Sequence, residues 1–565
     1  MSMTIIRSKY LVLVLTICFI GSCDQSLTDA NINPNGVTPE TANANLLLPN
    51  IMRGFARTKT NLDEGNASGV VQHMQEDGWY TRYNNFQWGA MDWNDYYDLL
   101  RNNKFVYDKA VENDEEFLQG ISLTLKSLIY GQVTDLWGDA PYSEALKSGD
   151  AENTVLTPKF DKQEDIYRGV IADLKSATSL FESVNSGGSA SNPGQSDILF
   201  NGDVDKWHSF ANSLILRYSM RLSEKLPDFA KDNIENVYTS GIYLKDAGDD
   251  VSIAYNDADI WLNAEVGTDP TFFRRRKFAN TLLDKLVNYN DPRLEVFVAP
   301  VHVQWVEDPT LTVDEDEFIR ENGEILDGVV SYTDKEFFAK VAAGNKYTRH
   351  FNPLTSDVQY DTREYVGLEA GMLAPDTHNG NPTPGQTVQN QHVSQRGDIF
   401  RNSTHELLQS RIITAAEVHF ILAEAAHKGW NTGSAENHYK AGVQQALNVW
   451  AVGDQYDEYI IENDVAYDGT LEQIIEQKYI AAFSMASEAW FDYRRTGYPE
   501  LVAGPATLQE PAIPLRYQYG ENEMKSNSSN LSEASERLET TSFSTVGANS
   551  SWSKPWVLQG TGQPW

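Results

Sequence analysis

Two pairs of carboxylates at helical spacing are the first residues in this sequence that could perform acid–base chemistry. Glu417 and Glu424 are seven residues apart, and Glu488 and Asp492 are four apart, so each pair shares one face of a predicted helix. Glycoside hydrolysis instead needs two carboxylates that face each other across a sugar, about 5 to 9.5 Å apart. We therefore interpret both pairs as solvated or ion-paired side chains rather than as a catalytic dyad.

The short motifs that mark common catalytic and cofactor sites are also missing from the sequence. It contains no Gly-x-Ser-x-Gly turn, no His-Glu-x-x-His helix and no phosphate-binding loop. His419 and His427 share a predicted helix, but two histidines without a third ligand beside them do not make a metal site. The acidic run 314–317 could bind Ca²⁺, although such runs are more often solvated. The sequence thus predicts no enzymatic activity, no metal site and no cofactor.

The segment between Gly78 and Gly89 combines aromatic rings, amides and an arginine, a mixture that binds sugars without catalysis. Aromatic faces contact the C–H face of a pyranose ring, and amide or guanidinium groups bond its hydroxyls. The aromatic residues follow no clear 3.6-residue period, so they either form a ligand platform or cover a helix end. The candidate ligand-binding residues are Trp79, Tyr80, Arg82, Tyr83, Asn84 and Trp88 here, and Trp261 and Trp305 in two other predicted loops.

Helical periodicity dominates the rest of the chain and must supply the scaffold for these loops. It is strongest at 411–430 and 471–493, and the clearest strand candidate is 295–306. Long predicted loops are typical of functional or partner-facing segments. They lie at 57–90, 185–203, 241–270, 305–335, 350–400 and 502–565. The tryptophans that we expect in the core are Trp137, Trp207, Trp430, Trp450 and Trp490.

The C-terminal tail is rich in Ser, Asn and Thr after Met524, yet it turns aromatic at Trp552, Trp556 and Trp565. That composition is unusual for a disordered tail, so we expect the tail to pack back on the body. No break in composition divides the chain, and the predicted organisation is a single α-helical domain over residues 42–565.

The composition excludes several classes of partner and stabilising bond. A net charge of −35 repels nucleic acid and anionic lipid surfaces. Only two cysteines are present, Cys18 and Cys23, so a chain that begins at Cys23 has no disulfide. Its stability must come from a core, and a chain of 565 residues with 41% hydrophobic content can bury a large one.

Residues 1–22 have the pattern of a bacterial lipoprotein signal peptide. Arg7 and Lys9 precede a largely apolar run at 11–20, and the small pair Gly21-Ser22 stands directly before Cys23. The run is too short for a permanent transmembrane helix, and no other run approaches that length. We predict lipidation of Cys23, followed by a polar tether over 23–41; an ordinary secretory signal with an accidental cysteine is the alternative.

Several segments resemble the SusD/RagB family of outer-membrane nutrient-binding lipoproteins. In chain order they are 133–145 (VTDLWGDAPYSEA), 290–294 (NDPRL), 414–425 (TAAEVHFILAEA), 475–481 (IEQKYIA), 488–499 (EAWFDYRRTGYP) and 513–517 (IPLRY). From their residues we interpret these segments as structural. Arg293 is expected to pack in the interior, and Glu488, Asp492, Arg494 and Arg495 are expected to form an architectural charge network.

The resemblance implies a mainly α-helical fold with tetratricopeptide-like helix pairs. It also implies a lipid-anchored protein at the outer face of the outer membrane, which captures an oligo- or polysaccharide and delivers it to a SusC-like TonB-dependent transporter. A peptide-binding protein, or a subunit that mainly gates the transporter, is the alternative. The family's binding residues lie in variable loops, so the resemblance carries no ligand residue over to this chain.

Overall fold

The computed structural model describes residues 43–148, 154–189, 191–255, 275–326, 339–341, 343–381, 390–401 and 405–561. The chain separates into two units, Met1–Ala44 and Asn45–Trp565, and the account below concerns the second. The predicted lipidation site, Cys23, and the candidate ligand residue Trp261 lie outside the described residues.

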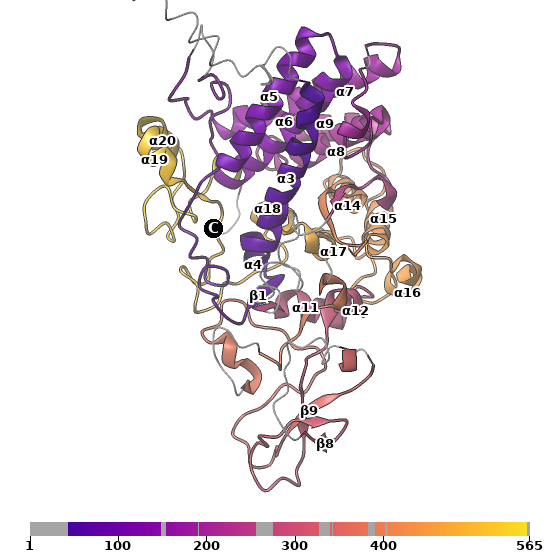
Figure 1. Cartoon of the computed structure of the whole chain (residues 1–565), viewed down its shortest axis with the longest axis vertical. Helices are drawn as coiled ribbons and strands as arrows, with labels where there is room; N and C mark the ends of the chain where they lie inside the picture. The colour runs from indigo at the N-terminus through magenta and orange to yellow at the C-terminus, as the bar shows by residue number, and fades with distance from the viewer. Residues whose placement is uncertain are drawn as a thin grey trace, which may run out of the picture. The chain divides into compact units, whose positions relative to one another are not determined.

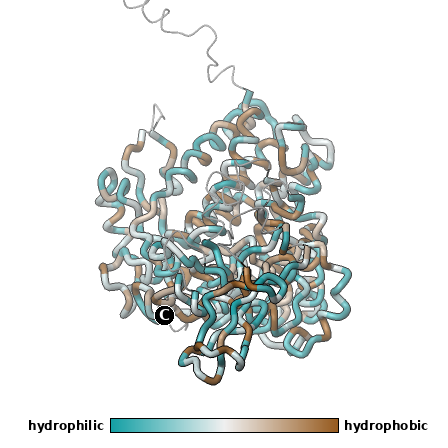
Figure 2. The backbone as a smooth tube through the Cα atoms, turned by 60° about the horizontal axis from the view of Figure 1, so that its bottom comes forward, coloured by the Kyte–Doolittle hydropathy of each residue, from teal (hydrophilic) through white to brown (hydrophobic). Residues whose placement is uncertain are grey.

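Consecutive helices that pack on each other build the first half of this unit (Figure 1). They are α3 (Leu48–Leu62), α5 (Asn94–Glu112), α6 (Glu116–Trp137), α7 (Gln163–Asn185), α8 (Val204–Arg221) and α9 (Pro227–Ser240). Hydrophobic and hydrophilic residues alternate along these helices (Figure 2), as expected for helices that bury one face. None of the described helices is both long and apolar enough to cross a membrane.

A second helical group follows near the C-terminal end of the sequence and packs against the first through α8 and α14. It comprises α14 (Ala415–His427), α15 (Ala435–Asn448), α16 (Tyr456–Tyr459), α17 (Leu471–Ala481) and α18 (Ala486–Thr496). Side-chain oxygens of Thr414, Ser434 and Thr470 accept hydrogen bonds from backbone N–H groups of the first turns of α14, α15 and α17. These caps satisfy donors that have no partner inside the helix.

Short strands connect the helical groups and form two four-stranded sheets. The first sheet has the order β1 (Met74–Glu76), β4 (Arg276–Phe278), β10 (Gln395–Arg396) and β5 (Val298–Ala299). The second has the order β6 (Gln304–Glu307), β9 (Tyr347–Phe351), β7 (Arg320–Glu321) and β8 (Glu324–Ile325), and it lies at the bottom of Figure 1. Two further pairs join β11 (Gln409–Ile413) to β3 (Val251–Ala254) and β12 (Gln518–Tyr519) to β2 (Ala90–Met91).

Several predicted boundaries are wrong in detail. The predicted loop 502–565, for example, contains α19 (Glu521–Ser526) and α20 (Ser528–Glu536). The predicted loop 57–90 begins as helix, because α3 runs to Leu62 and its buried face continues through Phe55 and Thr60. The predicted strand 295–306 contains α12 (Leu294–Phe297) before β5 and β6, because the chain re-enters a helical turn after the buried Asp291–Arg293 pair. Arg293 is fully buried and donates to Asp291 at 2.8 and 2.6 Å, which confirms its expected packing role.

Four of the five tryptophans expected in the core are buried: Trp137, Trp207, Trp450 and Trp490. Trp430 is only partly buried, because it follows the end of α14 in a turn that Gly429 opens with a φ of +79°. The tail packs on the body, as expected. Trp552 is buried and donates from Nε1 to the Ala512 carbonyl oxygen at 3.0 Å.

A buried charge network holds five helices together. Its members are Asp135, Arg217, Arg221, Glu417, Glu424, Lys478, Glu488, Asp492, Arg494 and Arg495, which lie on α6, α8, α14, α17 and α18. Arg217 donates to both oxygens of Glu417 at 2.7 and 2.6 Å, and Arg495 donates to Glu424 at 2.7 Å. The structure therefore confirms the predicted architectural network and gives the carboxylates of α14 a partner each.

The network makes the fold sensitive to acid. Burial opposes ionisation of Glu488, but Arg217 and Arg221 outweigh it and lower the pKa of Glu488 from 4.5 to about 2. A carboxylate whose pKa is lower in the folded state stabilises the fold above its unfolded pKa, and this stabilisation disappears as the pH falls through the folded value. We therefore expect the free energy of unfolding to decrease between about pH 4.5 and pH 2.

Urea denaturation followed by circular dichroism at a series of pH values measures this dependence. The Glu488→Gln variant is the comparison, because its side chain cannot titrate, and its curve should be shallower over the same range. Equal slopes for the two proteins would show that Glu488 does not carry the effect.

Candidate functional site

The candidate segment 78–89 follows strand β1, and buried ion pairs join this strand and the residue after it to β4. After α4 (Ser68–Val70) the chain turns at Gln72, which has a φ of +57°, and forms β1 beside β4. Arg276 of β4 donates from Nε to Glu76 Oε1 at 2.8 Å, and both side chains are buried. The next residues along each strand, Asp77 and Lys277, face each other at 3.6 Å. Burial raises the pKa of Asp77 to about 6, although Lys277 opposes the shift.

Tyr83 and Asn84 are buried and contact the paired residues Arg276 and Glu76. The guanidinium of Arg276 lies 3.8 Å from the centre of the Tyr83 ring. The Asn84 side chain accepts from the Glu76 backbone N–H and donates to the Glu76 carbonyl, both at 2.8 Å, as a neighbouring strand would. Gly69 lets the segment approach closely, because a Cβ there would lie 2.9 Å from the Tyr83 carbonyl oxygen. These two candidates therefore position the loop.

Trp88 and Trp305 are buried as well. Trp88 packs edge-on against Trp490 of α18 at 5.9 Å and against Tyr517 at 5.3 Å, so it covers a helix, as the alternative interpretation of the segment expects. Trp305 lies in β6, stacked on Tyr360 at 4.0 Å, and its Nε1 donates to a backbone carbonyl at 2.8 Å. In the described structure neither indole presents an open face to solvent.

The remaining candidates, Trp79, Tyr80 and Arg82, reach the surface. Trp79 is 59% exposed, and its backbone has a φ of +56°. Tyr80 is partly buried, and its hydroxyl donates to the Leu373 carbonyl oxygen at 3.3 Å. The segment thus divides into an inner half that packs and an outer half that could contact a ligand.

Two distant loops bring exposed apolar side chains to the same region. Leu373, Val502 and Leu508 are 69%, 54% and 48% exposed. Hydrogen bonds tie all three residues to the stretch 72–85. The Tyr80 hydroxyl donates to the Leu373 carbonyl, Gln72 Nε2 donates to the Val502 carbonyl at 2.9 Å, and the Leu508 N–H donates to the Asn85 carbonyl at 3.2 Å. We call this set the loop face, and its members are Trp79, Tyr80, Arg82, Leu373, Val502 and Leu508.

A glycine lets the two distant loops meet. Gly371 has a φ of +62°, and a Cβ there would lie 2.9 Å from the backbone nitrogen of Gly504. The Ala506 N–H donates to the Gly371 carbonyl at 2.8 Å, which locks the approach. Sequence reasoning missed Leu373, Val502 and Leu508, because isolated apolar residues in loops have no periodicity.

Polar groups border the loop face at a shallow cavity of about 370 Å³. Its lining comprises Gln72, Asn280, Thr281, Glu369, Ala370, Glu500 and Val502. Amide, hydroxyl and carboxylate groups of this kind exchange hydrogen bonds with the hydroxyls of a sugar. The loop face and the cavity share Val502, so apolar contact and hydrogen bonding are available side by side.

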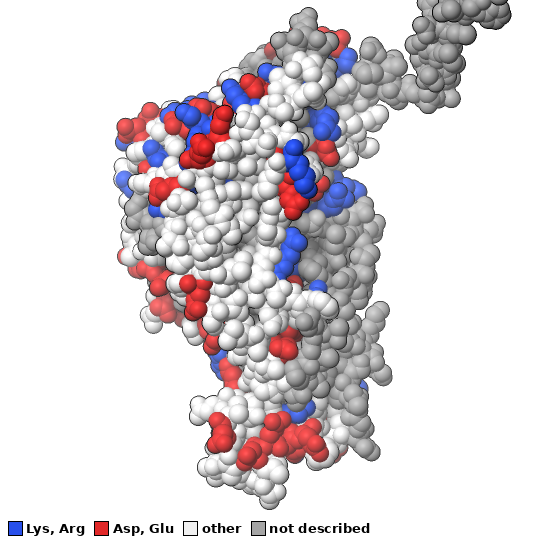
Figure 3. Space-filling model, turned by 90° about the vertical axis from the view of Figure 1, so that its left-hand side faces the viewer, with Lys and Arg blue, Asp and Glu red and all other residues white. Residues whose placement is uncertain are grey.

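The residues considered for other chemistry lie elsewhere. Among the described residues there is no group of three His, Cys, Asp or Glu side chains that could hold a metal ion. His419 bonds to His438 and to the Lys245 carbonyl. The acidic run 314–317 is partly ion-paired, since Glu315 contacts Arg349 at 3.5 Å. Figure 3 shows acidic side chains gathered at the lower end of the molecule, where Figure 1 places β8 and β9.

Comparison with known families identifies the fold. A family model described as "Starch-binding associating with outer membrane" matches residues 34–309 and 349–520, well over half of the chain. The chain belongs to the SusD-like family. This confirms the resemblance to SusD/RagB proteins and the mainly helical fold with tetratricopeptide-like helix pairs. The SusD-like match omits residues 310–348, which contain β7, β8 and the acidic run.

Solved structures share this SusD-like fold along almost their whole length. One described as a chitin-binding protein is 22% identical, with 92% of this chain and 99% of that chain covered and a TM-score of 0.67. A SusD homologue from Bacteroides fragilis is 21% identical, with 91% and 100% covered and a TM-score of 0.69. A chitin-binding SusD homologue from Flavobacterium johnsoniae is 22% identical, with 86% and 95% covered and a TM-score of 0.57. The comparison with curated proteins gives no match.

Proposed function

We propose that this SusD-like protein captures an oligo- or polysaccharide on the loop face and delivers it to a SusC-like TonB-dependent transporter, without catalysis. In this proposal the protein is a lipoprotein anchored through Cys23 at the outer face of the outer membrane. The family description, which names starch binding and the outer membrane, supports it. Two structurally similar proteins are described as chitin-binding, which favours a polysaccharide over a peptide as the ligand class.

The exposed indole of Trp79 is the single observation that carries the proposal. An isolated exposed tryptophan would need no explanation, but this one stands with three exposed aliphatic side chains on loops that are bonded to one another. Exposed apolar groups lose little conformational freedom on ligand binding when buried neighbouring residues already hold their loop in place. Arg82 adds donors for hydroxyl groups beside this apolar surface.

Replacing Trp79 by Ala tests the proposal. We expect affinity for the preferred polysaccharide to fall about tenfold or more, because a central aromatic contact often contributes about 2 kcal/mol to binding. Affinity gel electrophoresis with starch, soluble chitin derivatives, mannans and xylans identifies that ligand and measures the change. Phe318→Ala is the matched control, since Phe318 is 48% exposed and lies in the segment before β7. Equal retardation of the Trp79→Ala protein and the wild type would remove the loop face from the binding site.

The anchor is tested separately through Cys23. We expect the Cys23→Ala protein to be lost from the outer-membrane fraction and the cells to take up the polysaccharide more slowly, because lipid chains provide the membrane affinity. Cell fractionation and growth on the ligand measure these two effects. Normal localisation together with normal uptake would contradict the proposed anchor, while leaving the binding proposal unaffected.

A further inference from the structure

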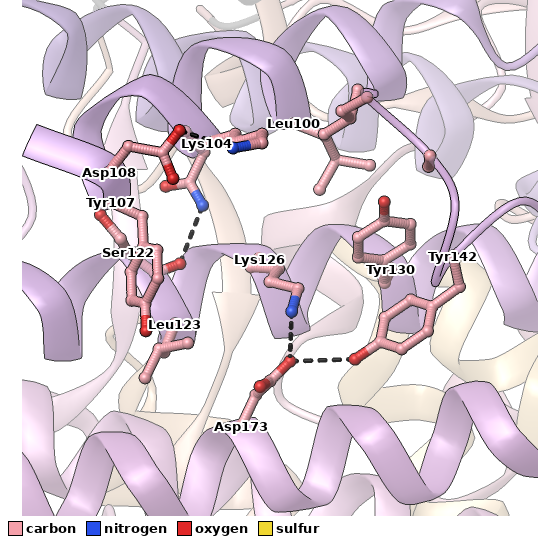
Figure 4. Close-up of a pocket in the computed structure, with 13 residues that line it drawn as sticks. Leu100, Lys104, Tyr107, Asp108, Ser122, Leu123, Lys126, Tyr130, Tyr142 and Asp173 are labelled. Atoms are coloured by element: carbon pink, nitrogen blue, oxygen red, sulfur yellow. Dashed lines mark hydrogen bonds and ion pairs between the residues drawn. The ribbon is translucent and has the colours of Figure 1, made fainter. Parts of the chain in front are cut away.

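A second pocket lies within the helical pairs and shares no residue with the loop face. It has a volume of about 290 Å³ and opens between α5, α6, α7 and the loop that follows α6 (Figure 4). The residues that line it are Leu100, Asn103, Lys104, Tyr107, Asp108, Ser122, Leu123, Lys126, Tyr130, Tyr142, Ala145, Leu146 and Asp173. This volume is at the small end of ligand pockets, which range over about 300–1,000 Å³, so it suits one ring rather than a chain.

Three deeply buried side chains that line the pocket carry polar atoms without a partner among the described residues. Tyr130 is 2% exposed, and Figure 4 draws no hydrogen bond from its hydroxyl to the other residues that line the pocket. Asn103 and Ser122 are 2% and 0% exposed, and Asn103 Oδ1 and Ser122 Oγ have no hydrogen-bond partner either. Asn103 Oδ1 and Ser122 Oγ are closed off from solvent, so the Tyr130 hydroxyl is the group of these three that a molecule in the pocket can reach.

The mouth of the pocket is charged but balanced. Lys126 Nζ lies 2.8 Å from Asp173 Oδ2, and the Tyr142 hydroxyl donates to the same oxygen at 3.0 Å. Both contacts use Oδ2, and none of the described residues donates to Asp173 Oδ1. Lys104 pairs with Asp108 at 2.5 Å. Two cations and two anions cancel, so the pocket favours a neutral polar ligand over a charged one.

Aromatic rings supply the remaining surface. Tyr130 and Tyr142 meet edge to face with their centres 4.7 Å apart, and Lys126 Nζ lies 5.2 Å from the centre of the Tyr142 ring. Figure 4 shows these two tyrosines on one side of Lys126 and Asp173, with Tyr107 and Leu123 on the other. A ligand between them would contact rings and aliphatic carbon on its sides and hydrogen-bonding groups at its rim.

We propose that this pocket is a second binding site, which takes one neutral polyhydroxylated ring, such as a single pyranose. One hydroxyl of the ring bonds to the Tyr130 hydroxyl, another donates to Asp173 Oδ1, and the ring lies against Tyr142. The inference rests on the pocket alone and does not require that the loop face binds polysaccharide. Its location on the helical pairs makes it a site for a free monosaccharide or a chain end, distinct from the surface proposed for a long chain.

Isothermal titration of the purified full chain with D-glucose, N-acetyl-D-glucosamine, D-mannose and D-galactose tests the pocket. For a ligand of about a dozen non-hydrogen atoms we expect a dissociation constant on the order of 1 mM. The Trp79→Ala protein serves as the background, so that the loop face does not contribute. In that background Ala145→Trp, which fills the mouth of the pocket from a loop, should abolish binding of the sugar.

Tyr130→Phe is the finer variant, because it removes only a hydroxyl that has no partner within the described protein. We expect affinity to fall roughly threefold to tenfold, as for one lost hydrogen bond, with no decrease in melting temperature. Tyr218→Phe is the matched control, since its buried hydroxyl donates to the Leu128 carbonyl at 3.3 Å and does not line the pocket. That variant should keep full affinity.

Three results would overturn the inference. The first is that none of the four sugars binds at concentrations up to about 20 mM, well above the expected dissociation constant. The second is binding that neither Ala145→Trp nor Tyr130→Phe weakens. The third is that the Trp79→Ala protein binds no sugar, whereas a protein with Ala145→Trp alone binds as the wild type does. That result would assign the sugar to the loop face and support the proposed function instead.

Discussion

Replacing Arg221 by Met is expected to lower the free energy of unfolding by about 3–5 kcal/mol, since removal of a shared buried cation leaves an excess of buried negative charge. Arg221 is nearly fully buried and lies 2.6 Å from Glu488, 3.1 Å from Asp135 and 3.8 Å from Asp492. Met retains most of the aliphatic stem, so the packing loss is small. The loss of charge dominates, because the three carboxylates lose the one cation that they share. Arg217 at 3.5 Å from Glu488 and Lys478 at 2.7 Å from Asp492 then compensate the network only in part.

Urea denaturation at pH 7 measures this effect, and the slope of the transition shows whether unfolding stays cooperative. Arg101→Met is the matched control, since Arg101 pairs with Asp98 at 2.9 Å while 67% of its side chain is exposed. An exposed pair contributes about 0–1 kcal/mol. If both Arg→Met proteins lost the same small amount, the buried charge network would not be a source of stability.

Replacing Arg276 by Met is expected to cost a comparable amount of stability and, in addition, to impair the loop face. Arg276 is the cation beside the buried Glu76, and its guanidinium supports the Tyr83 ring at 3.8 Å. Without it Glu76 keeps its charge only at a desolvation cost, and the segment between Gly78 and Gly89 loses the contact that fixes its inner half. We expect polysaccharide affinity to fall about tenfold, because the outer residues must then be ordered on binding.

Hydrogen exchange of residues 78–91, combined with affinity gels, distinguishes this effect from general instability. Arg276→Met should accelerate exchange in that segment, whereas Arg221→Met should leave both exchange there and affinity close to wild type under conditions where the protein is folded. If the two variants lost affinity in parallel with their stability, the loop face would not depend on Arg276 in particular.

The family segments and the helical core could be predicted from the sequence because they have regular spacing. Glu488 and Arg495 lie on one short helix, so an ion-paired network was foreseeable, although its partners on α8 and α14 were not. The strong helical pattern before Trp430 predicts a core position, and only the turn after α14 leaves this side chain partly exposed.

The candidate site was harder to predict, because no period separates a packed aromatic residue from an exposed one in a loop. Trp79 and Trp88 are of the same type and nine residues apart, yet one is 59% exposed and the other 6%. Packing against Trp490, more than four hundred residues later, decides the difference. Similarly, the spacing of Tyr130 does not reveal that its hydroxyl borders a cavity.

The contacts between the first hundred residues and the last hundred have a consequence for the order of assembly. The loop face depends on the hydrogen bonds that Gln72 donates to Val502 and that Leu508 donates to Asn85, and β2 pairs in parallel with β12. Contacts between such distant parts of a chain form late in folding, since the chain between them must be ordered first. A partly synthesised chain therefore has no loop face, and the loop face appears only on the finished protein.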